Sequence, residues 1–417
     1  MRVGIKMIKV RNISDVVEWQ LCTGCGMCAA MEPDRFSMTE VFRSGLRPTL
    51  KADAKPETGV AFKHCPGHQL KHTFDRQDER IDKSLVAGWG PVLGVWEGHA
   101  VDEEVRFKGS SGGAATALAL FGIERKGAEK VLHIASKSET PFRNEAVFSF
   151  SRNELLRRSG SRYAPASPCE KIGELKESAS KTIFIGKPCD IAAASSWESD
   201  SSSNELAIKI GFFCAGTPST QANIDLIERE NVSRENLISL KYRGEGWPGV
   251  WRAKDAMGKT SELTYAESWG FLQRFRQWRC YICPDHTAEF ADIAVGDPWY
   301  REIQATELGS SLIIARTQKG LDYIRAAESA GYIKLLQQNP ALLPLSQPKL
   351  LRSRGMLWAR LVVLRVFGAA APVYIGFSLL PFWISELSFK EKVKSFGGTI
   401  KRVYRKSLNK RVSVPAA

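Results

Sequence analysis

The chain has 417 residues, a length that predicts two or three domains. Its hydrophobic share of 43% and its charged share of 25% are ordinary for a globular protein, which excludes a disordered, collagen-like or coiled-coil chain. The net charge is +14, but residues 351–417 hold 13 Lys and Arg against 2 Asp and Glu. Since the rest of the chain is nearly neutral, we expect no nucleic-acid partner.

The first fifteen residues carry alternating charges and isolated apolar side chains, without the apolar stretch or the cleavage site of a signal peptide. We therefore expect a cytoplasmic protein whose thiols stay reduced. The nine cysteines are an odd number at low density, which argues against a disulfide scaffold. Clustered thiols in a reducing compartment are more often metal ligands or redox groups than bridges.

Three cysteines, Cys22, Cys25 and Cys28, stand within seven residues near the N-terminus, and Cys65 follows later with a Pro after it. Three thiolates in one tight loop, with a fourth from a distant Cys-Pro, are typical of a [4Fe–4S] cluster. Zinc is the alternative, because the histidines near Cys65 leave a mixed zinc site open. The continuation found in two-cluster ferredoxins is missing after Cys28, so we expect one cluster in this segment.

Between residues 90 and 345, short β-rich stretches alternate with helical ones. Helices are expected over Gly113–Phe121 and Ile191–Trp197, where Ala-rich sequence follows a Gly or an Asp. This alternation predicts an α/β fold, with an α+β mixed sheet as its core. The expected strands are Val131–Ala135, Ala146–Phe150, Thr182–Ile185, Ile208–Phe213, Ile293–Val295 and Ser311–Ala315.

Ser111, Gly112 and Gly113 directly precede the first of these helices. Small residues let the backbone approach a ligand, and the free N–H groups of a first helical turn attract the phosphates of a dinucleotide or flavin. Ordinary helix capping explains the same pattern. The Walker spacing and the Gly-x-Gly-x-x-Gly fingerprint are both missing, so a conventional nicotinamide site has no support. Lys187, in a second strand–turn–helix, suits a phosphate or a flavin ring.

Cys189 and Cys214 each follow a predicted strand, so both should lie at carboxyl ends of strands, where open α/β sheets bind ligands. Cys280 and Cys283, from a later loop, would complete four thiolates. The spacing alone leaves other interpretations open, namely two inert core cysteines and a separate zinc half-site or dithiol. Cys169 belongs to neither set, and we expect an unligated thiol there.

Residues 366–385 of the tail are uncharged, and nine cations follow between Lys390 and Arg411. Pro372 and Pro381 interrupt the apolar stretch. Three structures remain open: a helical hairpin packed on the body, a membrane-surface element with a basic border, and a membrane span. The second would place the protein peripherally on the inner face of the membrane.

The motifs occur along the chain in the order Cys-x2-Cys-Gly-x-Cys, Ser-Ser-Gly-Gly, Ser-Arg-Tyr, Phe-Ile-Gly-x-Pro-Cys-Asp, Phe-x-Cys-x-Gly-x-Pro-Ser, Tyr-Arg-x3-Trp, Arg-Cys-x2-Cys and Ala-Asp-Ile-x2-Gly-Asp-x-Trp. From about residue 20 to about residue 345, this ordered set resembles the family of coenzyme F-420 hydrogenase/dehydrogenase beta subunits, which are iron–sulfur flavoproteins. Lys187 and Asp190 depart from the residues common in that family, which weakens the case for a deazaflavin substrate. The tail looks like forms found beside bacterial polysaccharide genes.

The resemblance implies a second [4Fe–4S] cluster on the four later cysteines. It implies FAD beside the small-residue and basic motifs, at Ser111, Gly112, Gly113, Arg162, Tyr163 and Lys187. It assigns no catalytic residue. The predicted organisation is a ferredoxin-like segment, a flavin- and cluster-binding catalytic domain and a basic helical tail, at residues 1–80, 81–350 and 351–417.

We therefore expect an oxidoreductase that takes single electrons from a donor such as ferredoxin and reduces a small organic molecule by two electrons, with two clusters and FAD as cofactors. The substrate is expected in polysaccharide biosynthesis. The alternatives are an electron-transfer module without its own substrate, a deazaflavin oxidoreductase, and a zinc-stabilised binding protein held at the membrane by its tail.

Overall fold

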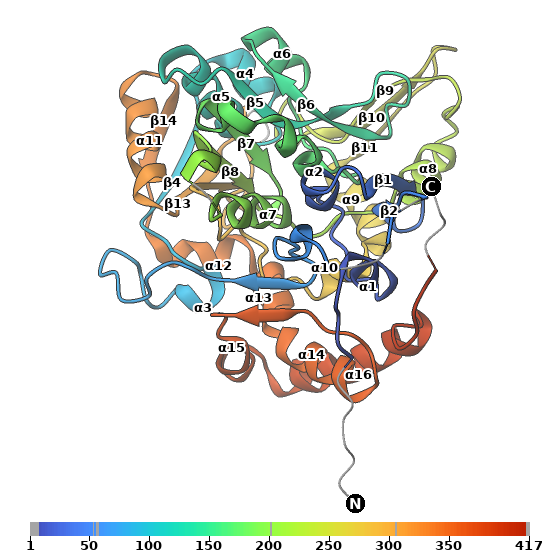
Figure 1. Cartoon of the computed structure of the whole chain (residues 1–417). Coiled ribbons are helices and arrows are strands. Elements are labelled where there is room, and N and C mark those ends of the chain that lie inside the picture. Colours follow the sequence, from blue (N-terminus) through green and yellow to red (C-terminus); the bar gives the residue numbers. More distant parts are fainter. Residues whose placement is uncertain (1–7, 53, 56–57, 201, 305–306, 414–417) are drawn as a thin grey trace, which may run out of the picture.

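The computed structural model describes residues 8–52, 54–55, 58–200, 202–304 and 307–413. Residues 1–7 and residues 414–417 lie outside these ranges. The first of these two segments is part of the N-terminal stretch that lacks a signal-peptide pattern. The core is an eight-stranded sheet (Figure 1). Its strands, from one edge to the other, are β14 (Ile333–Gln337), β4 (Gly94–Ala100), β13 (Ser311–Ala315), β12 (Ile293–Gly296), β8 (Ile208–Phe212), β7 (Thr182–Gly186), β5 (Lys130–Ser136) and β6 (Asn144–Ser149).

The four neighbouring strands β5, β7, β8 and β12 run parallel, and the strands toward both edges pair antiparallel. The predicted mixed sheet is therefore confirmed, and all six predicted strands are present. The expected helices are present as α5 (Ala114–Arg125) and α7 (Pro188–Glu198). Helix α7 begins three residues earlier than expected, with Pro188 in its first turn. Proline is tolerated there because an N–H group in the first turn has no acceptor within the helix.

Helices cover both faces of this sheet, as its continuously apolar central strands require. Strand β7 is buried along its whole length, and successive side chains point to opposite faces. Ile183 packs with α5 and α11 (Gln318–Ser329) on one face, whereas Phe184 packs with α7 on the other. The shorter helices of the body are α3 (Val86–Trp89), α4 (Glu103–Lys108), α6 (Arg152–Arg157) and α12 (Leu343–Ser346).

Two smaller units flank the carboxyl ends of the parallel strands. The N-terminal unit holds two helices and a hairpin, α1 (Ile13–Glu18), α2 (Met27–Met31), β1 (Phe36–Val41) and β2 (Gly45–Leu50). The second unit holds an antiparallel three-stranded sheet and three helices, α8 (Thr220–Arg229), β9 (Leu237–Lys241), β10 (Val250–Asp255), β11 (Thr260–Thr264), α9 (Tyr265–Leu272) and α10 (Trp278–Tyr281).

The tail folds into α13 (Pro348–Gly355), α14 (Leu357–Val366), β15 (Val373–Ile375), α15 (Leu379–Glu386) and α16 (Phe389–Arg405). Figure 1 shows α14, α15 and α16 together at the lower end of the molecule. Strand β15 pairs in parallel with β3 (Gln69–Lys71) of the N-terminal segment. Leu361 and Leu364 share a core with Val16, Trp278 and Ile282, so the inner side of the tail packs on the body.

Among the described residues, no helix has both the length and the apolar character that crossing a membrane would take.

A buried ion-pair network joins the tail to the body. Arg354 of α13 donates to one carboxylate oxygen of Glu289, and His72 Nε2 lies 2.8 Å from the other oxygen. Burial alone would raise the pKa of Glu289, but the Arg354 charge and the His72 hydrogen bond lower it to about 2.

We expect Glu289→Gln to lower the free energy of unfolding by about 3 kcal/mol at pH 7, because Arg354 is left buried without its counter-charge. The folded-state pKa is depressed, so the wild-type advantage should be complete above pH ~5 and should shrink as the pH falls toward 2. Denaturant unfolding of both proteins across this range measures the difference. Glu386→Gln, at an exposed carboxylate of the same tail, is the control, and an equal loss in both variants would contradict the expectation.

Candidate metal and cofactor centres

The four later cysteines meet at the carboxyl ends of two neighbouring parallel strands. Cys189 lies in the first turn of α7, three residues after the end of β7 and two after Lys187, and Cys214 lies just beyond β8. The α10 segment contributes Cys280 and Cys283. All four line one cavity with about 420 Å³ of empty space, part of it open to solvent. The sheet therefore gathers the cysteines predicted as a second set.

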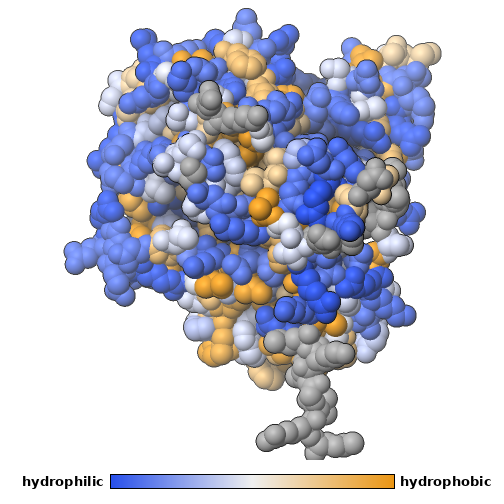
Figure 2. Space-filling view, viewed as in Figure 1, coloured by the Kyte–Doolittle hydropathy of each residue, from blue (hydrophilic) through white to orange (hydrophobic). Residues whose placement is uncertain are grey.

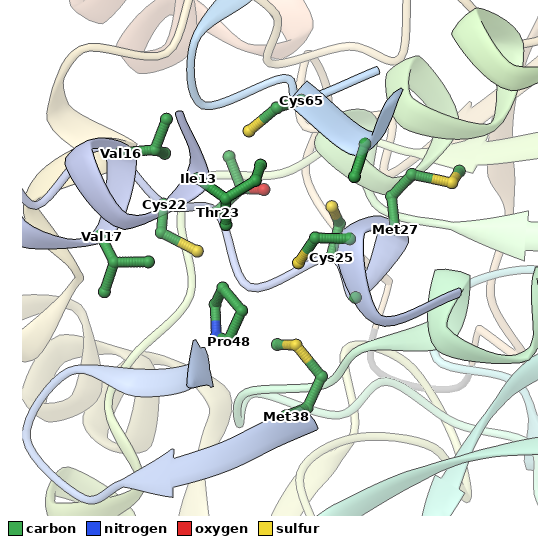
Figure 3. A pocket seen from close by; sticks show the side chains of 13 residues that line it. Ile13, Val16, Val17, Cys22, Thr23, Cys25, Met27, Met38, Pro48 and Cys65 are labelled. Carbon is green, nitrogen blue, oxygen red and sulfur yellow. The ribbon is translucent and has the colours of Figure 1, made fainter. Parts of the chain in front are cut away.

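The four earlier cysteines line a separate cavity, with about 340 Å³ of empty space that is also partly open. In Figure 3 the side chains of Cys22, Cys25 and Cys65 point toward one shared space, and Cys28 also lines this cavity. Gly26 adopts a φ of +90°, and a Cβ there would lie 2.9 Å from the backbone nitrogen of Glu170. Only glycine suits such a position, so the tight cysteine loop depends on it.

Backbone N–H groups point at several of these sulfur atoms. Gly24 N–H donates to Cys22 Sγ at 3.3 Å, and Thr217 N–H donates to Cys280 Sγ at 3.4 Å. Burial nevertheless raises the pKa of Cys65, Cys214 and Cys283 to about 12. Thiols in such surroundings ionise when a metal replaces their protons, and N–H···S bonds then stabilise the bound thiolate.

The donor set fits a [4Fe–4S] cluster in each cavity. Among the described residues, no three His, Cys, Asp or Glu side chains converge closely enough to hold one metal ion. The thiols of each set instead surround a cavity, and a [4Fe–4S] cluster takes one thiolate on each of four iron atoms. The four thiols of each cavity are therefore of the type and number that a [4Fe–4S] cluster takes.

The two cavities share a wall. Thr23 lines both, and Arg279 lines the cavity of the four later cysteines. Arg279 is 3% exposed, donates to the carbonyl oxygens of Pro66 at 2.8 Å and Ile282 at 3.2 Å, and has an Nε without a hydrogen-bond partner. No carboxylate in the described parts of the chain forms an ion pair with it. A buried positive charge thus stands between the segments that supply the two cysteine sets.

The residues expected around FAD are distributed over three places. Gly112 N–H donates to Ser311 Oγ at 2.9 Å, and a Cβ at Gly112 would lie 2.7 Å from the Gly98 carbonyl oxygen. Gly113 is the N-cap of α5 with a φ of +71°, and Ser111 Oγ donates to the Ser310 carbonyl oxygen. The bare glycines therefore let the start of α5 pack closely on β4 and β13.

Arg162 and Lys187 are occupied by protein partners. Arg162 donates to Asn144 Oδ1 at 2.8 Å and to the Leu240 carbonyl oxygen at 2.7 Å, so its guanidinium group joins β6 to β9. Lys187 Nζ lies 2.7 Å from Asp190 and lines the later-cysteine cavity. Burial alone would lower the pKa of Lys187, but the charges of Asp190 and Cys189 raise it above its ordinary value. The lysine is therefore a buried cation beside the cysteines.

An aromatic group that the sequence did not assign adjoins the glycine-rich loop. Arg243 makes two hydrogen bonds to Asp297, of 2.8 and 2.7 Å, and Trp247 Nε1 donates to the same carboxylate at 2.9 Å. The rings of Trp247 and Trp299 stack with centroids 5.6 Å apart. In the sequence, this group is marked by the motifs Tyr-Arg-x3-Trp and Gly-Asp-x-Trp, which both combine an ionic residue with aromatic residues.

Tyr163 and the glycine-rich loop both border this aromatic group. The ring of Tyr163 lies 6.5 Å from that of Tyr265, which stacks on Trp299 at 5.7 Å. A Cβ at Gly309 would lie 2.3 Å from the Ser111 carbonyl oxygen and 3.0 Å from Trp247 Cβ. Four of the six expected flavin residues, Ser111, Gly112, Gly113 and Tyr163, therefore lie in one region.

Comparison with known proteins gives one consistent result. Two family models, described as the N-terminal part and the C terminus of the coenzyme F420 hydrogenase/dehydrogenase beta subunit, match residues 95–173 and 179–340 respectively. The chain is 26% identical over 253 residues to the coenzyme F420 hydrogenase subunit beta of Methanococcus voltae, covering 56% of this chain and 81% of that protein. It is 22% identical over 306 residues to a subunit of the F(420)H(2) dehydrogenase of Methanosarcina mazei, covering 72% and 83%.

The fold agrees with a solved structure. A chain in the F420-reducing [NiFe] hydrogenase complex from Methanosarcina barkeri superposes with a TM-score of 0.51 at 19% sequence identity, covering 65% of this chain and 93% of that one. The likeness supports the mixed α/β architecture of the body. The two family models together span more than half of the sequence, so this chain belongs to the family of coenzyme F420 hydrogenase/dehydrogenase beta subunits.

Proposed function

We propose that this chain is the electron-transferring subunit of an oxidoreductase, with two [4Fe–4S] clusters and one FAD as resident cofactors. The observation that carries the proposal is the pair of four-cysteine cavities with a common wall at Thr23. Iron–sulfur clusters transfer single electrons, and a bound flavin couples such transfers to two-electron chemistry on an organic molecule. Because the two cavities are close, electrons would pass quickly between the two proposed clusters.

The protein residues would hold the cofactors and keep water away. Cys22, Cys25, Cys28 and Cys65 would ligate the first cluster, and the N–H groups near their sulfurs would stabilise its negative charge. Cys189, Cys214, Cys280 and Cys283 would ligate the second, beside the cations of Lys187 and Arg279. Buried cations compensate a buried anionic site, which lowers the energetic cost of placing it there.

The flavin proposal rests on the family resemblance and on one region of the structure. Ser111, Gly112 and Gly113 adjoin Tyr163 and the Trp247–Trp299 group, where stacked rings offer an apolar lining for a flat ring system. Lys187 and Arg162 remain part of the proposed set, although both already have protein partners.

The proposed partners are a one-electron donor such as ferredoxin and a small-molecule substrate. A substrate of polysaccharide biosynthesis is our first candidate. Coenzyme F-420 is the second, favoured by the names of the relatives, which include the beta subunit of an F420-dependent formate dehydrogenase in Methanococcus maripaludis. Because these relatives are named as subunits, a chain that serves a partner enzyme without its own substrate is the third.

We expect protein purified without oxygen to contain about eight iron atoms and eight acid-labile sulfides per chain, with one FAD. Metal, sulfide and flavin analyses, together with the absorbance spectrum, measure this directly. A colourless protein with zinc and no iron would refute the proposal. Turnover of F-420 by the isolated chain with a chemical reductant would then separate the deazaflavin alternative from the other two.

A further inference from the structure

The outer side of the tail has an unusual division of side chains along α16. Ser395, Thr399 and Val403 are buried and form its inner side. Two exposed stripes run next to each other along the remainder of the helix surface, because 3.6 residues complete each turn. One stripe is apolar and the other is basic.

The apolar stripe contains large side chains in contact with water. Phe389 is 82% exposed, Val393 57% and Tyr404 64%. Leu380 and Ile384 of the preceding helix α15 are exposed as well. In Figure 2 apolar surface gathers at the lower end of the molecule, where Figure 1 places α15. Exposed apolar surface that extends over two helices marks an interaction site rather than the scattered apolar residues of an ordinary surface.

The basic stripe consists of four exposed cations at helical spacing, Lys390, Lys394, Lys401 and Arg405. None of the four has an ion-pair partner among the described residues. The nearby Glu391 is engaged at the start of the helix, where it accepts hydrogen bonds from Ser388. The cations are therefore available to an external negative charge.

We propose that the outer side of α15 and α16 docks on an anionic lipid surface. An apolar stripe that enters the headgroup region beside Lys and Arg at the phosphate level is the arrangement by which interfacial helices bind membranes. Each cation near such a surface contributes about 1 kcal/mol. Three of the four cations are Lys, which protein–protein interfaces avoid, so the composition favours lipid over a protein partner.

Docking in this way leaves the cofactor region above the membrane. Helix α16 packs on α14, and α14 shares its core with Trp278 and Ile282 beside Cys280. The lipid-facing side and the side that faces the cysteine cavities are therefore opposite sides of one helical layer. The inference does not depend on which substrate the chain reduces.

The test uses the full-length protein purified without oxygen, with vesicles of phosphatidylcholine alone or with 30% phosphatidylglycerol. We expect sedimentation with the anionic vesicles only, weakened as salt rises toward 0.5 M because the charges are screened. The triple variant Lys390→Gln, Lys394→Gln, Lys401→Gln should bind about 100-fold more weakly. The double variant Phe389→Ser, Val393→Ser should lose binding at every salt concentration.

Matched controls remove the same charge and the same kind of exposed apolar group elsewhere. Lys126→Gln, Lys137→Gln, Lys259→Gln takes three exposed cations from the body, and Met257→Ser takes an exposed apolar side chain. Both controls should bind like the wild type. Equal binding by the tail variants and the controls, binding to neutral vesicles, or no binding to anionic vesicles would each overturn the proposal. Iron content, followed separately, reports on the proposed cofactors.

Discussion

Cys214→Ser should lower the iron content from about eight to about four atoms per chain, because the [4Fe–4S] cluster proposed for the later-cysteine cavity would lose one of its four thiolates. The N-terminal set is untouched, so its signal should persist in the electron paramagnetic resonance spectrum of the reduced protein. Transfer of electrons from a reduced donor to the proposed flavin should be abolished. Iron analysis, spectra and stopped-flow flavin reduction measure the three effects.

Cys169→Ala is the matched control for this substitution. Cys169 is fully buried, lines neither cavity, and directs its thiol to the Asp190 carbonyl oxygen at 3.4 Å. The variant should keep about eight iron atoms, since no cluster ligand is removed. A full iron content in Cys214→Ser, or a loss of one cluster in Cys169→Ala, would show that the cysteines are wrongly assigned.

Arg279→Met should shift the midpoint potentials of both proposed clusters to more negative values. The side chain is buried, carries no ion pair with a carboxylate among the described residues and lies next to both cysteine sets, so its charge favours the more negative, reduced forms. Removing one charge at this depth is worth on the order of 2 kcal/mol, or about 90 mV for a one-electron couple. Redox titration followed by electron paramagnetic resonance resolves a change of this size.

Arg279→Lys separates charge from packing in this experiment. Both variants lose hydrogen bonds to the carbonyl oxygens of Pro66 and Ile282, but only Arg279→Met loses the charge. The Lys variant should therefore keep potentials much closer to those of the wild type. Equal shifts in the two variants, or no shift in Arg279→Met, would mean that the guanidinium group serves only to hold the loop.

The first cysteine set could be predicted because its signal is local, since Cys22, Cys25 and Cys28 share one loop. Cys189 and Cys214 could be placed at carboxyl ends of strands, but only the family resemblance joined them to Cys280 and Cys283. The sequence could not predict the pairing of β3 with β15, because three-residue strands show no periodicity. The sequence therefore did not decide among the three arrangements of the tail. In the structure the inner side of the tail packs on the body.

The charged partners could not be predicted from the sequence. Arg243 and Asp297 are 54 residues apart in the chain and follow strands of two different sheets, β9 and β12, so only the complete fold brings them within 2.8 Å. Arg162 matched a family motif, yet its bonds to Asn144 and Leu240 depend on the position of β9. Periodicity identifies elements, whereas a buried ion pair depends on how distant loops converge.

The pairing of β3 with β15 has a consequence for biosynthesis. Roughly 300 residues separate the two strands, so at 5–20 residues per second the ribosome finishes the second strand on the order of 15–60 s after the first. During that interval the nascent β3 lacks the strand that pairs with it. Iron and sulfide delivery to the cluster proposed for Cys22, Cys25, Cys28 and Cys65 would therefore have a period of access before β15 pairs with β3.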